Sequence, residues 1–124
     1  MILQFIKKYA IYIIFIFIIF FGDFKETYIK SKYNGDDVIF YNFNTSWCYY
    51  SKILQPEWRN LTKHYSNNKK VKIIDIKCDD EKNKNICKKF KIRKFPTLIK
   101  IKKGKQTYYN GKRTLNKFIE FIEN

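Results

Sequence analysis

Residues 46–51 have the sequence Ser46-Trp47-Cys48-Tyr49-Tyr50-Ser51 and join two segments of different hydrophobic pattern. The continuous apolar run from Val38 to Phe43 predicts a strand buried on both faces. The apolar spacing from Tyr49 to Ser66 predicts a helix. Cys48 is therefore expected at a strand-to-helix turn, where the first N–H groups and the helix dipole favour the thiolate. Three residues on, where a Cys-x-x-Cys redox motif has its second sulfur, the chain has Ser51.

The rest of the chain alternates between strand and helix patterns. Strands are expected at Val71–Ile76, Phe95–Ile101 and Gln106–Tyr109, and helices at Phe24–Tyr33, Glu81–Phe90 and Leu115–Ile122. Lys103-Gly104 is expected to turn the chain between the last two strands. This order predicts one three-layer α/β domain.

The N-terminal segment is apolar on every face. Behind Lys7 and Lys8, residues 9–21 form an uninterrupted apolar run of 13 residues, a length that suits a signal peptide. If the two lysines snorkel to the interface, residues 2–21 are long enough to span a membrane. Bulky Phe20 disfavours cleavage after Gly22, so we expect a single-pass signal anchor, with secretion after cleavage as the alternative.

The charge before and after this segment predicts its orientation. Lys7, Lys8 and the terminal amine precede the apolar run, which places residues 23 onward in the lumen of the secretory pathway or outside the cell. We therefore expect two parts, residues 1–22 as signal anchor or signal peptide and residues 23–124 as the folded domain. The N-terminal segment makes the membrane an expected partner.

The composition argues against nucleic acid as a partner. The net charge of +15 comes from 26 basic and 11 acidic residues, yet only three of the basic residues are Arg. Nucleic-acid binders favour clustered charge and bidentate Arg contacts, whereas here Lys is spread over the whole chain and is expected to be solvated. His64 is the only His, so no metal site is expected, nor any cofactor.

Several landmarks together resemble the thioredoxin fold, and most closely the catalytic domains of protein disulfide isomerases. They are the Trp47-Cys48 turn, the Leu54-Gln55-Pro56-Glu57-Trp58 helix, Asp75 and Cys78 after the second strand, Phe95-Pro96-Thr97, and Tyr109-Asn110-Gly111-Lys112-Arg113. The resemblance covers about residue 37 to the C-terminus. It implies a mixed four-stranded sheet whose first edge strand is missing or short, because few residues precede Val38.

The resemblance also implies roles for individual residues. The bond before Pro96 is expected to be cis, so that Phe95 offers its backbone groups to an extended client peptide. Arg113 matches an arginine that adjusts the pKa of the active-site cysteine, although a solvated residue at a helix start is an equal alternative. Cys78 and Cys87 match a small structural disulfide, with two buried thiols as the alternative.

Two positions depart from the family pattern. Ser51 replaces the resolving cysteine, so a mixed disulfide between Cys48 and a client cannot be released by an internal thiol. The Ser51 hydroxyl can still donate a hydrogen bond to the Cys48 thiolate. Asn42 replaces a buried acid that serves the resolving cysteine, and without that cysteine the acid would be an expensive buried charge. Adaptation to one thiol and coincident decay predict the same two changes.

The leading hypothesis is thiol–disulfide exchange on protein clients by Cys48, assisted by Ser51 and Arg113, in the secretory pathway. The residues expected to contact the client are Trp47, Tyr49, Tyr50, Phe95 and Pro96. One alternative is a thiol-dependent retention factor or chaperone that binds clients without turnover. Another is a degenerate scaffold with an inert thiol, and a dithiol mechanism using Cys78 or Cys87 would require one of them to reach Cys48.

Overall fold

The computed structural model describes residues 1–16 and 35–124 and divides the chain into two compact units, Met1–Asn34 and Gly35–Asn124. In the first unit, residues 2–16 are helical and their side chains are exposed. Among the described residues, no helix is both long and apolar enough to cross a membrane. The expected span continues to Phe21, so it lies partly outside the described residues and gains no support from them. The expected helix at Phe24–Tyr33 and the boundary after residue 22 also lie outside them.

The second unit is built on a mixed four-stranded sheet, as predicted. Its strands are β1 (Val38–Asn44), β2 (Val71–Lys77), β3 (Thr97–Lys102) and β4 (Lys105–Tyr108), in the spatial order β2-β1-β3-β4. β1 pairs in parallel with β2 and antiparallel with β3, and β3 pairs antiparallel with β4. Within residues 35–124 no strand lies on the outer side of β2, which agrees with the missing first edge strand.

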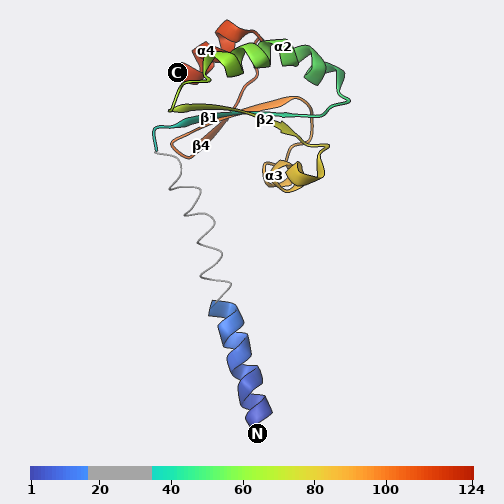
Figure 1. The fold of residues 1–124 in the computed structure, drawn as a ribbon, viewed down its shortest axis with the longest axis vertical. Coiled ribbons are helices and arrows are strands. Elements are labelled where there is room, and N and C mark those ends of the chain that lie inside the picture. The colour runs from blue at the N-terminus through green and yellow to red at the C-terminus, as the bar shows by residue number, and fades with distance from the viewer. Residues whose placement is uncertain (17–34) are drawn as a thin grey trace. The chain divides into compact units, whose positions relative to one another are not determined.

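Helices cover both faces of this sheet (Figure 1). The long helix α2 (Tyr49–His64) and the C-terminal helix α4 (Leu115–Glu123) lie over one face, and α3 (Lys84–Lys89) lies over the other. The predicted three-layer α/β architecture is therefore confirmed. The expected helix at Glu81–Phe90 differs in detail, because it begins with a 3₁₀ turn, Glu81–Asn83, in which the Asp80 side chain accepts from the N–H of Lys82.

Each face of β1 supplies one half of the hydrophobic core, which explains why the residues from Val38 to Tyr41 and Phe43 are apolar or aromatic. On the α2 and α4 side, Phe40 is fully buried, and its ring centroid lies 5.2 Å from that of Trp58 and 5.9 Å from that of Phe118. On the α3 side, Phe43 packs against Phe90 with centroids 5.0 Å apart. Burial of one such side chain is worth roughly 1.5–3 kcal/mol.

One lysine departs from the expectation that Lys is solvated. Lys100 on β3 is only 8% exposed, and its Nζ donates to the carbonyl oxygen of Phe121 at 2.6 Å. The same Nζ lies 4.3 Å from the centroid of the Phe121 ring. Burial, and then the charge of Lys102, lower the pKa of Lys100. This lysine therefore tethers the last turn of α4 to the sheet.

Candidate functional site

The parallel pairing of β1 and β2 sets the position of the candidate site. Parallel strands end at the same edge of a sheet, so the turn after β1 and the loop after β2 meet there. The N–H of Ser46 donates to Asp79 Oδ2 at 3.1 Å, and the N–H of Cys78 donates to the carbonyl of Asn44 at 2.8 Å. The Cys48 turn is thus held by the segment that follows β2.

Cys48 is the N-cap residue of α2. Its backbone is extended, with φ −76° and ψ 124°, and its carbonyl accepts the N–H of Lys52 at 3.1 Å. The sulfur is half-buried and lies 3.5 Å from the carbonyl oxygen of Phe95, a distance that suits an S–H donor. The thiol therefore sits where the unpaired N–H groups of the first helical turn are available to it.

These N–H groups lower the pKa of the Cys48 thiol. The backbone N–H of Ser51 has the largest effect, followed by the Ser51 hydroxyl. Partial burial acts in the opposite direction, while the N–H of Tyr50 and the charge of Arg113 lower the pKa further. Favouring the charged form is what a nucleophilic thiol requires.

Ser51 is the buried side chain that faces this sulfur. It is 1% exposed, and within residues 1–16 and 35–124 its hydroxyl has no hydrogen bond of standard geometry. A hydroxyl rotates freely, and a thiolate is a better acceptor than a thiol, so the Ser51 hydroxyl can turn toward the sulfur once Cys48 ionises. The Ser51 hydroxyl is therefore placed to donate a hydrogen bond to a Cys48 thiolate.

Phe95 and Pro96 lie beside Cys48. The peptide bond between them is cis, as the resemblance implies. The ring of Phe95 meets that of Trp47 edge to face, with centroids 6.0 Å apart. The structure thus brings residues from two distant parts of the chain to one place beside the sulfur.

The aromatic residues around the turn are exposed. Trp47, Tyr49 and Tyr50 are 67%, 69% and 62% exposed. The rings of Tyr49 and Tyr50 contact each other, with centroids 5.6 Å apart. Large exposed aromatic side chains beside a free thiol form a surface suited to an apolar part of a partner.

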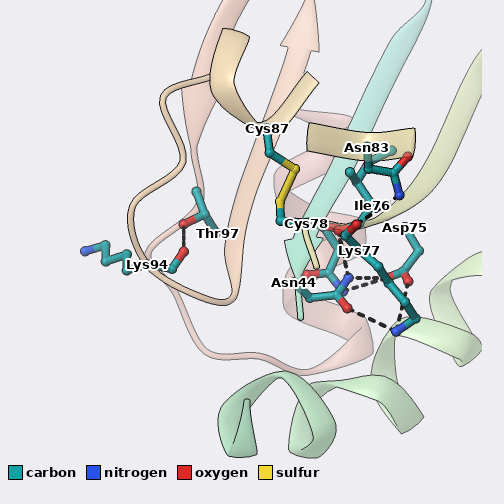
Figure 2. The surroundings of a disulfide bond; sticks show 10 residues. Asn44, Asp75, Ile76, Lys77, Cys78, Asn83, Cys87, Lys94 and Thr97 are labelled. Atoms are coloured by element: carbon teal, nitrogen blue, oxygen red, sulfur yellow. Dashed lines mark hydrogen bonds and ion pairs between the residues drawn. A yellow bond between two sulfur atoms is a disulfide. The ribbon is translucent and has the colours of Figure 1, made fainter. Parts of the chain in front are cut away.

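Cys78 and Cys87 form a disulfide on the other face of the sheet (Figure 2). Their Cα atoms are 5.9 Å apart, and Cys87 packs in the same cluster as Phe43 and Ile99. Cys48 is left as the free cysteine. Cys78 and Cys87 are therefore occupied with each other, which gives no support to a role for either as resolver for Cys48.

Asp75, one of the landmarks of the resemblance, lies within β2 rather than after it, and beside Asn42. The side-chain amides of Asn42 and Asn44 donate to the same oxygen of Asp75, at 2.9 and 2.8 Å. Lys77 Nζ lies 3.2 Å from Asn44 Oδ1 and 3.9 Å from Asp75 Oδ2 (Figure 2). The acid missing from position 42 of β1 is thus matched by one on β2, directly opposite in the strand register.

His64 and Arg113 are the other two sites of interest, one as a candidate metal ligand and the other as a charge near Cys48. His64 is exposed on α2 and contacts the ring of Tyr65, with centroids 4.7 Å apart. No group of three His, Cys, Asp or Glu side chains suited to a metal ion occurs in the described part of the chain. Arg113 is exposed, and its charge reaches Cys48 only as the smallest of the effects on the pKa.

Comparison with known proteins shows to which family the chain belongs. The family description Thioredoxin matches residues 22–124. The chain belongs to the thioredoxin family. It is 40% identical over 83 residues to protein disulfide-isomerase 1 of Dictyostelium discoideum, which covers 64% of this chain and 23% of that protein. It is 35% identical over 83 residues to a thioredoxin domain-containing protein of Theileria parva, which covers 66% of this chain and 36% of that protein.

Solved structures give the same result. Human ERp44, crystal form I, aligns with a TM-score of 0.63 and 26% identity over 77% of this chain and 26% of that one. A fragment of ERdj5 aligns with a TM-score of 0.59 at 23% identity, which supports the fold alone. The chain is therefore a disulfide-isomerase-like thioredoxin domain. It spans about a quarter to a third of the length of the two curated relatives and of ERp44.

Proposed function

We propose that the domain carries out thiol–disulfide exchange on protein clients through Cys48 as its single reactive thiol. The observation that carries the proposal is the placement of this free sulfur at the N-terminus of α2, where the N–H groups of Ser51 and Tyr50 lower its pKa. Relatives named protein disulfide-isomerase support the reaction class.

The proposed reaction has two steps and needs no external oxidant. The Cys48 thiolate attacks a client disulfide, so that a Cys48–client disulfide forms and one client sulfur leaves as a thiolate. A second client thiolate then attacks the client sulfur of this mixed disulfide, which forms a new client disulfide and releases Cys48. The number of disulfides is unchanged, so the reaction is isomerisation.

The roles of the neighbouring residues follow from their positions. Ser51 supports the thiolate through its N–H and hydroxyl, and Arg113 contributes positive charge. We assign client binding to the backbone of Phe95 beside Pro96 and to the exposed rings of Trp47, Tyr49 and Tyr50. In the structure the Cys48 thiol lies on the carbonyl of Phe95, so ionisation of the thiol leaves that carbonyl free for a client N–H.

The alternative function is thiol-dependent binding or retention without turnover. It is favoured by Ser51, since no thiol within the motif can release a trapped client. Refolding of a client with scrambled disulfides, in the presence of catalytic amounts of the protein, separates the two. Isomerase activity predicts many turnovers that vanish in Cys48→Ala, whereas retention predicts a stable mixed disulfide of equal stoichiometry and no gain in refolding rate.

We further propose that the domain acts in the secretory pathway, with the apolar N-terminal segment as its anchor. The Cys78–Cys87 disulfide supports an oxidising compartment. The N-terminal sequence of the mature protein and its extraction from membranes at alkaline pH test the anchor. A mature protein that starts after residue 22 would exclude it and favour secretion after cleavage.

A further inference from the structure

A cleft with a basic lining lies beside the Phe95–Pro96 loop. It has a volume of about 590 Å³, and its walls come from residues 91–98 of one segment and from residues 108–111 and Arg113 of another. The two are brought together by the β3–β4 pairing, in which the N–H of Tyr109 donates to the carbonyl of Leu98 at 2.9 Å. Because Phe95 and Pro96 are part of this lining, the cleft begins next to the residue that contacts Cys48.

The charge of the lining has one sign. Lys91, Arg93, Lys94 and Arg113 contribute four cationic side chains, and no Asp or Glu is among the lining residues. All four cations are exposed, and none has an ion-pair partner in the part of the chain that the structure describes. Unpaired like charges around a concave surface concentrate anions there.

We propose that this cleft, which we call the basic cleft, binds an acidic segment of the client polypeptide whose cysteine reacts with Cys48. The proposal rests on the proposed function and adds a substrate class to it. The volume lies in the range that accommodates a ligand of several residues. The two Arg side chains offer bidentate geometry for carboxylates, and Tyr108, half exposed at 51%, adds an aromatic surface.

The position of the cleft favours a client segment over a separate ligand. Phe95 contributes both to the contact with the Cys48 sulfur and to the cleft lining, and Arg113 both lowers the pKa of Cys48 and lines the cleft. A peptide that lies along Phe95 with its cysteine at Cys48 thus extends into the basic cleft on one side. Acidic residues a few positions from the reacting cysteine are then placed among the cations.

The test uses two peptides, each with a single cysteine blocked as a pyridyl disulfide. One has Asp residues on both sides of the cysteine and the other has Asn residues in the same places. Attack of the Cys48 thiolate on the peptide sulfur forms the Cys48–peptide disulfide and releases pyridine-2-thione, whose absorbance gives the rate constant. The full chain is compared with Arg93→Gln/Lys94→Gln, which removes two cleft charges and avoids Lys91, whose φ of 52° is unfavourable for most side chains.

A matched control removes the same charge elsewhere. Lys69 and Lys70 are exposed and precede β2, at the opposite edge of the sheet from Cys48. Lys69→Gln/Lys70→Gln therefore lowers the net charge equally and leaves the basic cleft intact. Comparison of the two double variants separates an effect of the cleft from attraction by the net charge of +15.

We expect the Asp peptide to react about 3- to 10-fold faster than the Asn peptide, from two or three screened charge pairs, with the preference falling as salt rises. Arg93→Gln/Lys94→Gln should bring the ratio of the two peptide rates close to one, while the control variant keeps the ratio of the unaltered chain. An equal loss in both double variants, or no preference in the unaltered chain, would overturn the proposal.

A second measurement keeps the cleft testable if Cys48 is unreactive. Binding of the same peptides, labelled and without the pyridyl group, is measured by fluorescence anisotropy with Cys48→Ala. Selective binding of the Asp peptide that depends on Arg93 and Lys94 supports the basic cleft even when exchange fails. Absence of selective binding refutes the cleft, whether or not Cys48 exchanges disulfides.

Discussion

The Cys78–Cys87 disulfide provides the prediction whose magnitude is clearest. Cys78→Ala/Cys87→Ala removes a covalent link between residues nine positions apart, which closes a loop of ten residues. In the chain-entropy account such a loop stabilises the folded state by about 2.7 kcal/mol at 25 °C. The loss of packing by Cys87 beside Phe43 adds a smaller amount, so we expect the free energy of unfolding to fall by about 3 kcal/mol.

Urea unfolding of the full chain, followed by near-ultraviolet circular dichroism, measures this loss. For a unit of 90 residues, Gly35–Asn124, each kcal/mol corresponds to about 4–8 °C, so the melting temperature should fall by roughly 12–24 °C. Cys48 is kept in both proteins, and the m-value is fitted separately for each, because the unfolded chain without the disulfide is less compact.

The prediction also has a local component. Asp79 follows the disulfide directly and accepts the N–H of Ser46 in the Cys48 turn. Loss of the link should therefore increase hydrogen exchange at Ser46 more than at residues of α4. A change in stability below about 0.5 kcal/mol, or uniform exchange across the domain, would show that the disulfide does not hold this edge of the sheet.

Three further outcomes follow from the structure. Glu57→Ala should lower the free energy of unfolding in urea by about 1 kcal/mol. Glu57 Oε2 accepts the first N–H of α4, that of Leu115, at 2.7 Å, and a change near zero would refute this cap. Burial has the largest effect on the pKa of Tyr65, and the charge and hydrogen bond of Glu123 also raise it, to about 12. The stabilisation that comes from the neutral Tyr65 hydroxyl is therefore complete below the unfolded pKa of about 10 and is lost as pH rises through about 12. When urea unfolding is measured in a Cys48→Ala background, the free energy of unfolding should fall over this pH range in the protein that keeps Tyr65. It should not show this fall in Tyr65→Phe. Phe40→Ala should cost about 3–5 kcal/mol in the same assay, since this ring is fully buried, and a cost under about 1 kcal/mol would contradict the described core.

The parts of the fold that the sequence predicts well are those with a strong local signal. β1 is mostly apolar because both of its faces are buried, and α2 buries Leu54, Trp58 and Leu61 at helical spacing. The turn at Lys103-Gly104 is also correct, with both residues at positive φ. Local pattern alone is sufficient for these elements.

The features that were missed depend on contacts between distant segments. The approach of Asp75 to Asn42 follows from the register of β1 with β2, which composition does not reveal. Lys100 was expected to be solvated like the other lysines and is instead buried, because the carbonyl of Phe121 at the end of α4 accepts its ammonium group. Both interactions join residues that are far apart in the sequence, so no local pattern predicts them.

The basic cleft was missed for the same reason. Its cations belong to residues 91–94 and to Arg113, which are separated in the chain by β3 and β4. Arg113 was singled out for its effect on Cys48, but in a chain with 26 basic residues no local signal groups it with Lys91, Arg93 and Lys94. They line one cleft because the antiparallel pairing of β3 with β4 brings the two segments together.

The central claim is that the N-terminus of α2 lowers the pKa of the Cys48 thiol, and the pH dependence of its alkylation tests this most directly. The rate is measured with iodoacetamide on the full chain, with the Cys78–Cys87 disulfide intact, for the parent and for Ser51→Ala. We predict an apparent pKa below that of an ordinary thiol in the parent, and a higher value in Ser51→Ala, which keeps the N–H of residue 51 and loses the hydroxyl. An apparent pKa at or above that of a free thiol, with no change in Ser51→Ala, would contradict the account.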